Sequence, residues 1–150
     1  MSDFEREIVC CLNRFFKTHH IPGFACRLKP NKTMIQHVDV LVDSPDPAYN
    51  LSIEYKSIID RKLYFTQHFR ADRNNVHQVD AIADFLDQSG RIGYLALEFR
   101  QGPGKTSEAF LIPWETVVGH FRANKGITIE DARAGVALSR SKDGYVLENL

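Results

Sequence analysis

The stretches that decide the fold are Val38-Asp39-Val40-Leu41-Val42 and Ile53-Glu54-Tyr55-Lys56-Ser57. Both are rich in the β-branched and aromatic residues that favour strands. Between them stands Asp43-Ser44-Pro45-Asp46-Pro47, whose residues are typical of turns. We therefore expect two neighbouring strands that pair in antiparallel fashion.

Polar side chains converge where these two strands lie side by side. Because successive side chains of a strand point to opposite faces, Glu54 and Lys56 share one face and Tyr55 lies on the other. Antiparallel pairing would bring Asp39 within metal-bridging distance of Glu54. Two carboxylates about 4 Å apart repel by roughly 4 kcal/mol at an effective dielectric near 20. The pair therefore needs a bound cation or a raised pKa.

Mg²⁺ is the cation that such a pair favours, with Mn²⁺ as a substitute. It takes one or two carboxylates, keeps several waters and completes its shell with phosphate oxygens. Asp39 and Glu54 are the expected ligands. Lys56 would orient or deprotonate the attacking water, or stabilise the charge that builds on the phosphate. The pattern predicts phosphodiester hydrolysis.

The rest of the chain supplies helices and strands in the order αβββαββα. Hydrophobic residues recur at helical spacing from Phe4 to Phe16. A second helix has Asn74 or Asn75 as its cap and Val76 as its first core residue. This order predicts one α/β domain over residues 1–150, with a mixed central β-sheet flanked by α-helices. The expected strands are 24–28, 34–42, 51–55, 92–99 and 109–112, the later helices are 76–89 and 114–121, and residues after 125 show no clear pattern.

An Asp on one strand and Glu-x-Lys on the next, inside an αβββαβ order, resembles the PD-(D/E)XK nuclease superfamily. Residues 4–9, 38–39, 53–57 and 85–99 resemble archaeal Holliday-junction resolvases in particular, and residues 75–78 and 90–97 are similar to bacterial RecU resolvases. The resemblance implies a restriction-endonuclease-like core and a Mg²⁺-dependent DNA endonuclease. It further implies a homodimer that resolves four-way (Holliday) junctions in recombination and repair.

The resemblance also assigns roles to individual residues. Asp39 and Glu54 correspond to direct metal ligands, with the Tyr55 carbonyl as a third. Lys56 corresponds to the catalytic lysine. Glu5 matches a helical glutamate that reaches the metal, and Gln78 matches a polar residue of the second helix near the site.

Several of these residues also have simpler explanations. Ser2 and Glu5 form a capping box, which accounts for Glu5 without a metal. Gln78 is also an ordinary polar residue for the first turn of a helix. Asp46, in the literal Pro-Asp pair, lies among turn residues, so we favour Asp39 as the metal ligand. Residues 102–106 imitate a phosphate-binding loop but lack its first glycine and predict a hairpin loop.

Overall charge does not identify the partner, since 19 Lys and Arg residues balance 19 Asp and Glu residues. The most basic stretch is residues 56–73, where aromatic residues stand among the cations. Cations beside a metal site suit a phosphate backbone, and the expected DNA contacts are Arg61, Lys62, Arg70 and Arg73. The alternative for this stretch is a solvated loop. The alternatives for the whole protein are a less structure-selective nuclease, a non-catalytic DNA-binding module and an aromatic protein-binding surface.

Nothing in the sequence predicts a membrane or secretory protein. The longest uncharged apolar runs, such as residues 93–97, fall far short of the roughly 20 residues of a membrane span. Residues 1–7 are charged where a secretory signal would have its apolar stretch. The three cysteines match no zinc spacing and are expected to be buried in a reducing compartment. We therefore expect a cytoplasmic protein.

Overall fold

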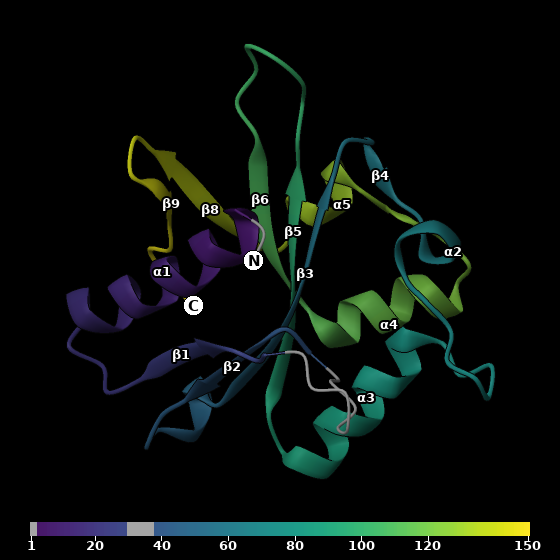
Figure 1. Ribbon diagram of the computed structural model, residues 1–150, viewed down its shortest axis with the longest axis horizontal. Helices are drawn as coiled ribbons and strands as arrows, with labels where there is room; N and C mark the ends of the chain where they lie inside the picture. Colours follow the sequence, from purple (N-terminus) through teal and green to yellow (C-terminus); the bar gives the residue numbers. More distant parts are fainter. Residues whose placement is uncertain (1–2, 30–37) are drawn as a thin grey trace.

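A seven-stranded mixed sheet runs through the computed structural model, which describes residues 3–29 and 38–150 (Figure 1). Its strand order is β1-β2-β3-β5-β6-β8-β9. β3 and β5 run parallel, and the other neighbouring pairs of this sheet run antiparallel in the described residues. The predicted α/β class and the αβββαβ core are confirmed.

The elements of the core lie close to their predicted positions. Both predicted ends of the second helix agree to within two residues, and its C-terminal cap is Gly90, in the left-handed conformation that glycine tolerates best. Residues 34–37 of the predicted strand 34–42 and Ser2 of the capping box lie outside the described residues, and β2 begins at Val40. The core elements are α1 (Asp3–Thr18), β1 (Phe24–Arg27), β2 (Val40–Asp43), β3 (Leu51–Ile58), α3 (Gln78–Ser89), β5 (Ile92–Phe99), β6 (Glu108–Pro113) and α4 (Trp114–Arg122).

The basic stretch 56–73 and the residues after 125, where the sequence analysis gives no complete helix or strand, contain several short elements. The basic stretch begins with the last residues of β3, and it also contains a short strand and a single helical turn. The end of the chain adds two strands to the sheet edge next to β6 and a third that pairs with β4. These elements are η1 (Pro47–Tyr49), β4 (Lys62–Leu63), α2 (Phe65–His68), β7 (Ile127–Thr128), α5 (Ile129–Ala132), β8 (Val136–Ser141) and β9 (Gly144–Val146).

The two faces of the sheet carry separate hydrophobic cores. α1 covers one face, where residues of β8 and β9 join the core, while α3 and α4 cover the other (Figure 1). Ile53 of β3 belongs to the core under α1, and Ile58 belongs to the core under α3 and α4. β3 is therefore covered on both sides, and only its C-terminal half lacks a β2 partner. No helix in the described part of the chain is long and apolar enough to cross a bilayer.

Three local predictions are wrong. The cap of α3 is His77, whose Nδ1 accepts from the Val79 amide at 3.1 Å, rather than Asn74 or Asn75. Val76 precedes the helix and is 39% exposed, so it is not a core residue. Cys10 is exposed and Cys26 half-buried, because both face away from the packed side of their elements, and only Cys11 is buried.

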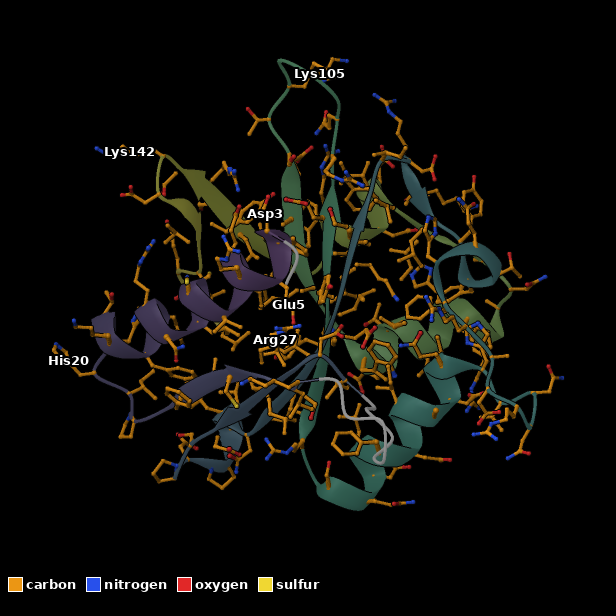
Figure 2. All side chains as sticks on the ribbon, in the orientation of Figure 1. Asp3, Glu5, His20, Arg27, Lys105 and Lys142 are labelled. Carbon is orange, nitrogen blue, oxygen red and sulfur yellow. The ribbon has the colours of Figure 1, made fainter. Side chains whose placement is uncertain are left out.

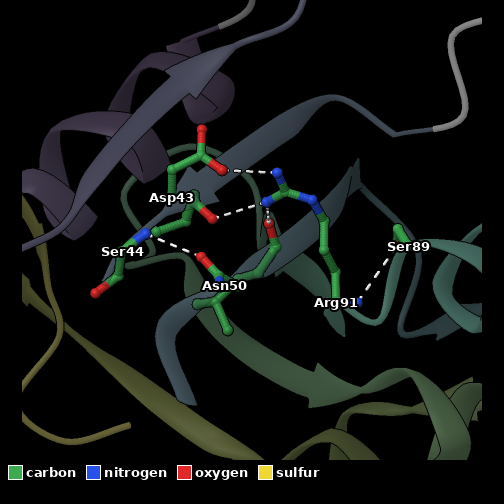
Figure 3. Close-up of polar contacts among 7 residues, drawn as sticks. Asp43, Ser44, Asn50, Ser89 and Arg91 are labelled. Carbon is green, nitrogen blue, oxygen red and sulfur yellow. Dashed lines mark hydrogen bonds and ion pairs between the residues drawn. The ribbon is translucent and has the colours of Figure 1, made fainter. Parts of the chain in front are cut away.

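Arg91, which directly precedes β5, forms hydrogen bonds and an ion pair with residues at the turn between β2 and β3 (Figure 3). Its guanidinium donates to the carbonyls of Val42 and Leu51 at 2.9 and 3.2 Å. It also forms an ion pair with Asp43, with the nitrogen and oxygen 2.6 Å apart. These bonds hold together the ends of the two strands that carry the predicted site.

Replacing Arg91 by Ala is expected to lower the free energy of unfolding by about 2 kcal/mol, because each lost hydrogen bond contributes roughly 1 kcal/mol. Urea denaturation followed by circular dichroism measures the change. Arg14→Ala is the control, since Arg14 is an exposed residue of α1. Equal stabilities of the two variants would contradict the role given to Arg91.

Candidate active site

The carboxyl groups of Asp39 and Glu54 meet at the edge where β2 stops pairing with β3. Asp39 directly precedes β2, and its amide donates to the Ile53 carbonyl at 3.1 Å. Its Oδ2 accepts from the Tyr55 amide at 3.0 Å. The Glu54 carboxyl lies within hydrogen-bond reach of Asp39 and is only 4% exposed. The predicted convergence of these two acids is therefore observed.

Burial and mutual repulsion oppose ionisation of this pair. Burial, and then the neighbouring Asp39 carboxylate, raise the pKa of Glu54 to about 8. Burial is also the main cause that raises the pKa of Asp39, against the Tyr55 amide, which lowers it. Two acids that resist ionisation at one place form a site where a cation is stabilising.

Lys56 and Gln78 both contact the Glu54 carboxylate. The Lys56 ammonium lies 3.4 Å from Glu54 Oε1 and 4.8 Å from the centre of the Phe69 ring. The Gln78 side-chain amide donates to the same oxygen at 3.0 Å. Gln78 reaches the site from the first turn of α3, which packs on the face of β3 that bears Glu54. The predicted Glu54, Lys56 and Gln78 thus lie together.

Glu5 enters from α1 and is neutralised by a residue that the sequence analysis missed. Glu5 Oε1 accepts from Arg27 Nε of β1 at 2.8 Å, and Glu5 is 4% exposed. Figure 2 shows the two side chains pointing toward one another between α1 and β1. The negative charge of Glu5 also raises the pKa of Asp39, so Glu5 lies near the pair. No spacing in the sequence indicates Arg27, because its partner lies on another element.

The Tyr55 carbonyl faces the same edge as the Asp39 carboxylate. Residues two apart in a strand present their backbone groups to the same side. Ile53 bonds toward β2, and so does the Tyr55 amide. Beyond Ile53, β2 no longer pairs with β3, so the Tyr55 carbonyl points at this open edge.

The oxygen atoms at this site suit a hard divalent cation that takes only a few of its ligands from the protein. Across residues 3–29 and 38–150, no three His, Cys, Asp or Glu side chains are grouped closely enough to hold a metal ion by themselves. Two carboxylates and one carbonyl remain, all of them oxygen donors. Mg²⁺ needs only one or two carboxylates because it keeps several waters. The residues present therefore fit this ion.

The four predicted DNA contacts fall into two groups. Arg61 is exposed in the turn after β3, and Lys62 follows on β4 with its ammonium 5.6 Å from the centre of the Tyr64 ring. Arg70 and Arg73 are exposed between α2 and α3. The backbone carbonyl of Arg70 accepts from the backbone amide of Gln78 at 2.7 Å. This bond places the backbone of Arg70 beside the site.

The ion pair between Glu5 and Arg27 is expected to stabilise the fold. A double-mutant cycle with Glu5→Gln and Arg27→Gln should give a coupling energy of about 1.5–3 kcal/mol, the range for hydrogen bonds to charged groups. The free energies of unfolding of the four proteins measure it. A coupling energy near zero would show that the two side chains act independently.

Comparison with solved structures gives an informative likeness, whereas comparison with family models and curated proteins gives none. No family model matches the sequence, and no curated protein matches it. Among solved structures, the chain is similar to Hjc from Archaeoglobus fulgidus, described as a Holliday junction resolvase from an archaeal hyperthermophile. The alignment has a TM-score of 0.58 and 18% identity, and it covers 89% of this chain and 91% of that one. The chain therefore has the resolvase-like fold of this archaeal protein.

Proposed function

We propose that this protein is a divalent-metal-dependent endonuclease that hydrolyses DNA phosphodiesters at four-way junctions. The observation that carries the proposal is the convergence of Asp39, Glu54 and Lys56 at the point where β2 stops pairing with β3. Its support is the shared fold with a structure described as a Holliday junction resolvase. The alternative is a less structure-selective nuclease with the same site, which would cleave linear duplex as well as junctions.

Asp39, Glu54 and the Tyr55 carbonyl would hold Mg²⁺, which supplies a Lewis acid for the phosphate and lowers the pKa of a bound water. The side-chain amide of Gln78 fixes the orientation of the Glu54 carboxylate through a hydrogen bond of 3.0 Å. A carboxylate held in this way loses little conformational freedom when substrate arrives.

Lys56 supplies the positive charge of the site. Its ammonium has the Glu54 carboxylate on one side and the face of Phe69 on another, and both contacts favour a cation. A fixed cation beside the reacting phosphate stabilises the charge that builds on its oxygens. We therefore assign Lys56 to transition-state stabilisation, with proton transfer to or from the attacking water as its alternative role.

The proposed substrate requires two cuts. Resolution of a four-way junction breaks two opposed strands, whereas one chain presents one pair of converging carboxylates. We therefore propose a homodimer with one site per copy. Light scattering at micromolar protein concentration measures the mass of the particle in solution. The mass of a single chain would contradict the proposed homodimer.

The test is a cleavage assay with an end-labelled four-way junction and a linear duplex of the same sequence, each with EDTA, Mg²⁺ or Mn²⁺. The proposal expects paired nicks near the branch point of the junction, in metal only. Equal cleavage of both substrates would indicate a less selective nuclease. Tight binding without any product would indicate a non-catalytic DNA-binding module.

A further inference from the structure

A second polar cleft lies beyond the C-terminal end of β3. It has a volume of about 340 Å³ and is bounded by the β3–β4 turn, the β5–β6 hairpin and α5. Figure 2 shows Lys105 at the tip of that hairpin. The charged residues that line the cleft are the cations Arg61, Arg100, Lys105 and Arg133 and the acids Asp60, Glu108 and Glu130.

Most of the cationic side chains in this cleft have no acidic partner. Glu108 is engaged by Arg133 at 3.3 Å, and Asp60 lies 3.6 Å from His68. Within the described part of the chain, no salt bridge involves the other three cations. Those three are all exposed, and they come from two segments that line the cleft, the β3–β4 turn and the β5–β6 hairpin: Arg61, Arg100 and Lys105.

The cleft lies on the same face of the sheet as the candidate active site. Lys56 and Ile58 share a face of β3, and Ile58 belongs to the same hydrophobic core as Phe99, which lines the cleft. Arg61 is five residues after Lys56, so their backbones are at most about 18 Å apart. Because the rise along one DNA strand is about 3.4 Å per nucleotide, this distance corresponds to about five nucleotides or fewer.

We infer that Arg61, Arg100 and Lys105 form a second phosphodiester-binding site, which holds the DNA backbone within about five nucleotides of the scissile phosphate. Arginine presents a planar fork of donors that matches phosphate oxygens, and two of the three cations are arginines. This inference rests on the proposed function, since it extends the same substrate to a second contact. A contact at this distance fixes the direction of the strand across the site without reading its sequence.

The experiment compares the full-length protein with the triple variant Arg61→Gln, Arg100→Gln, Lys105→Gln. Affinity for a fluorescent four-way junction is measured in EDTA at several salt concentrations. We expect the triple variant to bind at least about tenfold more weakly and to show a salt slope lower by about two to three, since each neutralised phosphate contributes about 0.9. The exposed positions of the three residues predict unchanged melting temperatures.

Single neutral methylphosphonates then locate the contact along the strand. In the parent protein, one or two substitutions within about five nucleotides of the scissile phosphate should weaken binding. In the triple variant the same substitutions should have no effect, because the cations that contact those phosphates are gone. The matched control is Lys142→Gln, which neutralises an exposed lysine in the β8–β9 turn and should leave affinity unchanged (Figure 2).

The outcomes separate this inference from the proposed function. If the parent cleaves junctions and the triple variant binds them as tightly as the parent, the second site is wrong and the nuclease stands. If the triple variant weakens binding without any position-specific methylphosphonate effect, the cations act only through their general field and the site is also wrong. If the parent never cleaves but shows methylphosphonate effects at one or two positions that the triple variant lacks, the second site stands and the proposed catalysis does not.

Discussion

Replacing Asp39 by Asn or Glu54 by Gln is expected to reduce metal-stimulated DNA cleavage by more than about 100-fold. Loss of a residue that only supports a metal ligand costs about 10–100-fold in metal affinity or activity, and these two carboxylates are the proposed ligands themselves. Both substitutions keep the size of the side chain, and the amide oxygen introduced by Asp39→Asn would still accept from the Tyr55 amide. The expected defect is therefore chemical rather than structural. Single-turnover cleavage of a labelled junction in Mg²⁺ measures it.

Asp46→Asn is the matched control for these variants. Asp46 completes the literal Pro-Asp pair, yet its carboxylate accepts from the Ala48 amide at 3.0 Å and caps η1 at the surface. We expect its rate of cleavage to equal that of the parent protein. Junction affinity in EDTA should be retained by all three variants. Full activity in both Asp39→Asn and Glu54→Gln would end the assignment of this site.

The sequence predicts those parts of the site where a local rule determines the direction in which a side chain points. Alternation along a strand places Glu54 and Lys56 on one face whatever the rest of the fold does, and the structure brings them to 3.4 Å. The turn residues 43–47 likewise limit how far the strand of Asp39 can lie from β3. These rules depend on neighbours in the chain, so one sequence suffices to apply them.

Contacts between distant elements follow no such rule. Arg27 pairs with Glu5 only because α1 packs beside β1, and Arg61 lies near Arg100 and Lys105 only because the β3–β4 turn lies beside the β5–β6 hairpin. The β8–β9 hairpin did have a local signal, because turn-favouring residues stand at its tip: Lys142 and Asp143 connect the strands, and Gly144, which pairs with Ser141, has a positive φ of 111°. The strands on either side of this turn are short, and their apolar and polar residues alternate over too few positions to predict a strand.

In the absence of metal, the free energy of unfolding is expected to fall as the pH rises from about 4.5 to about 8. The folded-state pKa of Glu54 is raised from 4.5 to about 8, so between these values the folded protein holds a proton that the unfolded chain has released. Stability then decreases by up to about 1.4 kcal/mol per pH unit for this group. Urea denaturation in EDTA at pH 5 and pH 8 measures the change. Glu54→Gln, which cannot ionise, should be less sensitive to pH and gain at least about 2 kcal/mol at pH 8 relative to the parent.

Mg²⁺ is expected to reverse this loss, because a cation favours the ionised carboxylates that burial opposes. A ligand at about 100 times its dissociation constant stabilises the folded state by about 2.7 kcal/mol, which is a rise of several degrees in melting temperature. The rise should be larger at pH 8 than at pH 6, where protons compete with the metal for Asp39 and Glu54. It should disappear in Asp39→Asn and Glu54→Gln and persist in Asp46→Asn. An equal rise in all four proteins would place the metal elsewhere on the chain, and no rise in the parent would favour a purely structural role for the two acids.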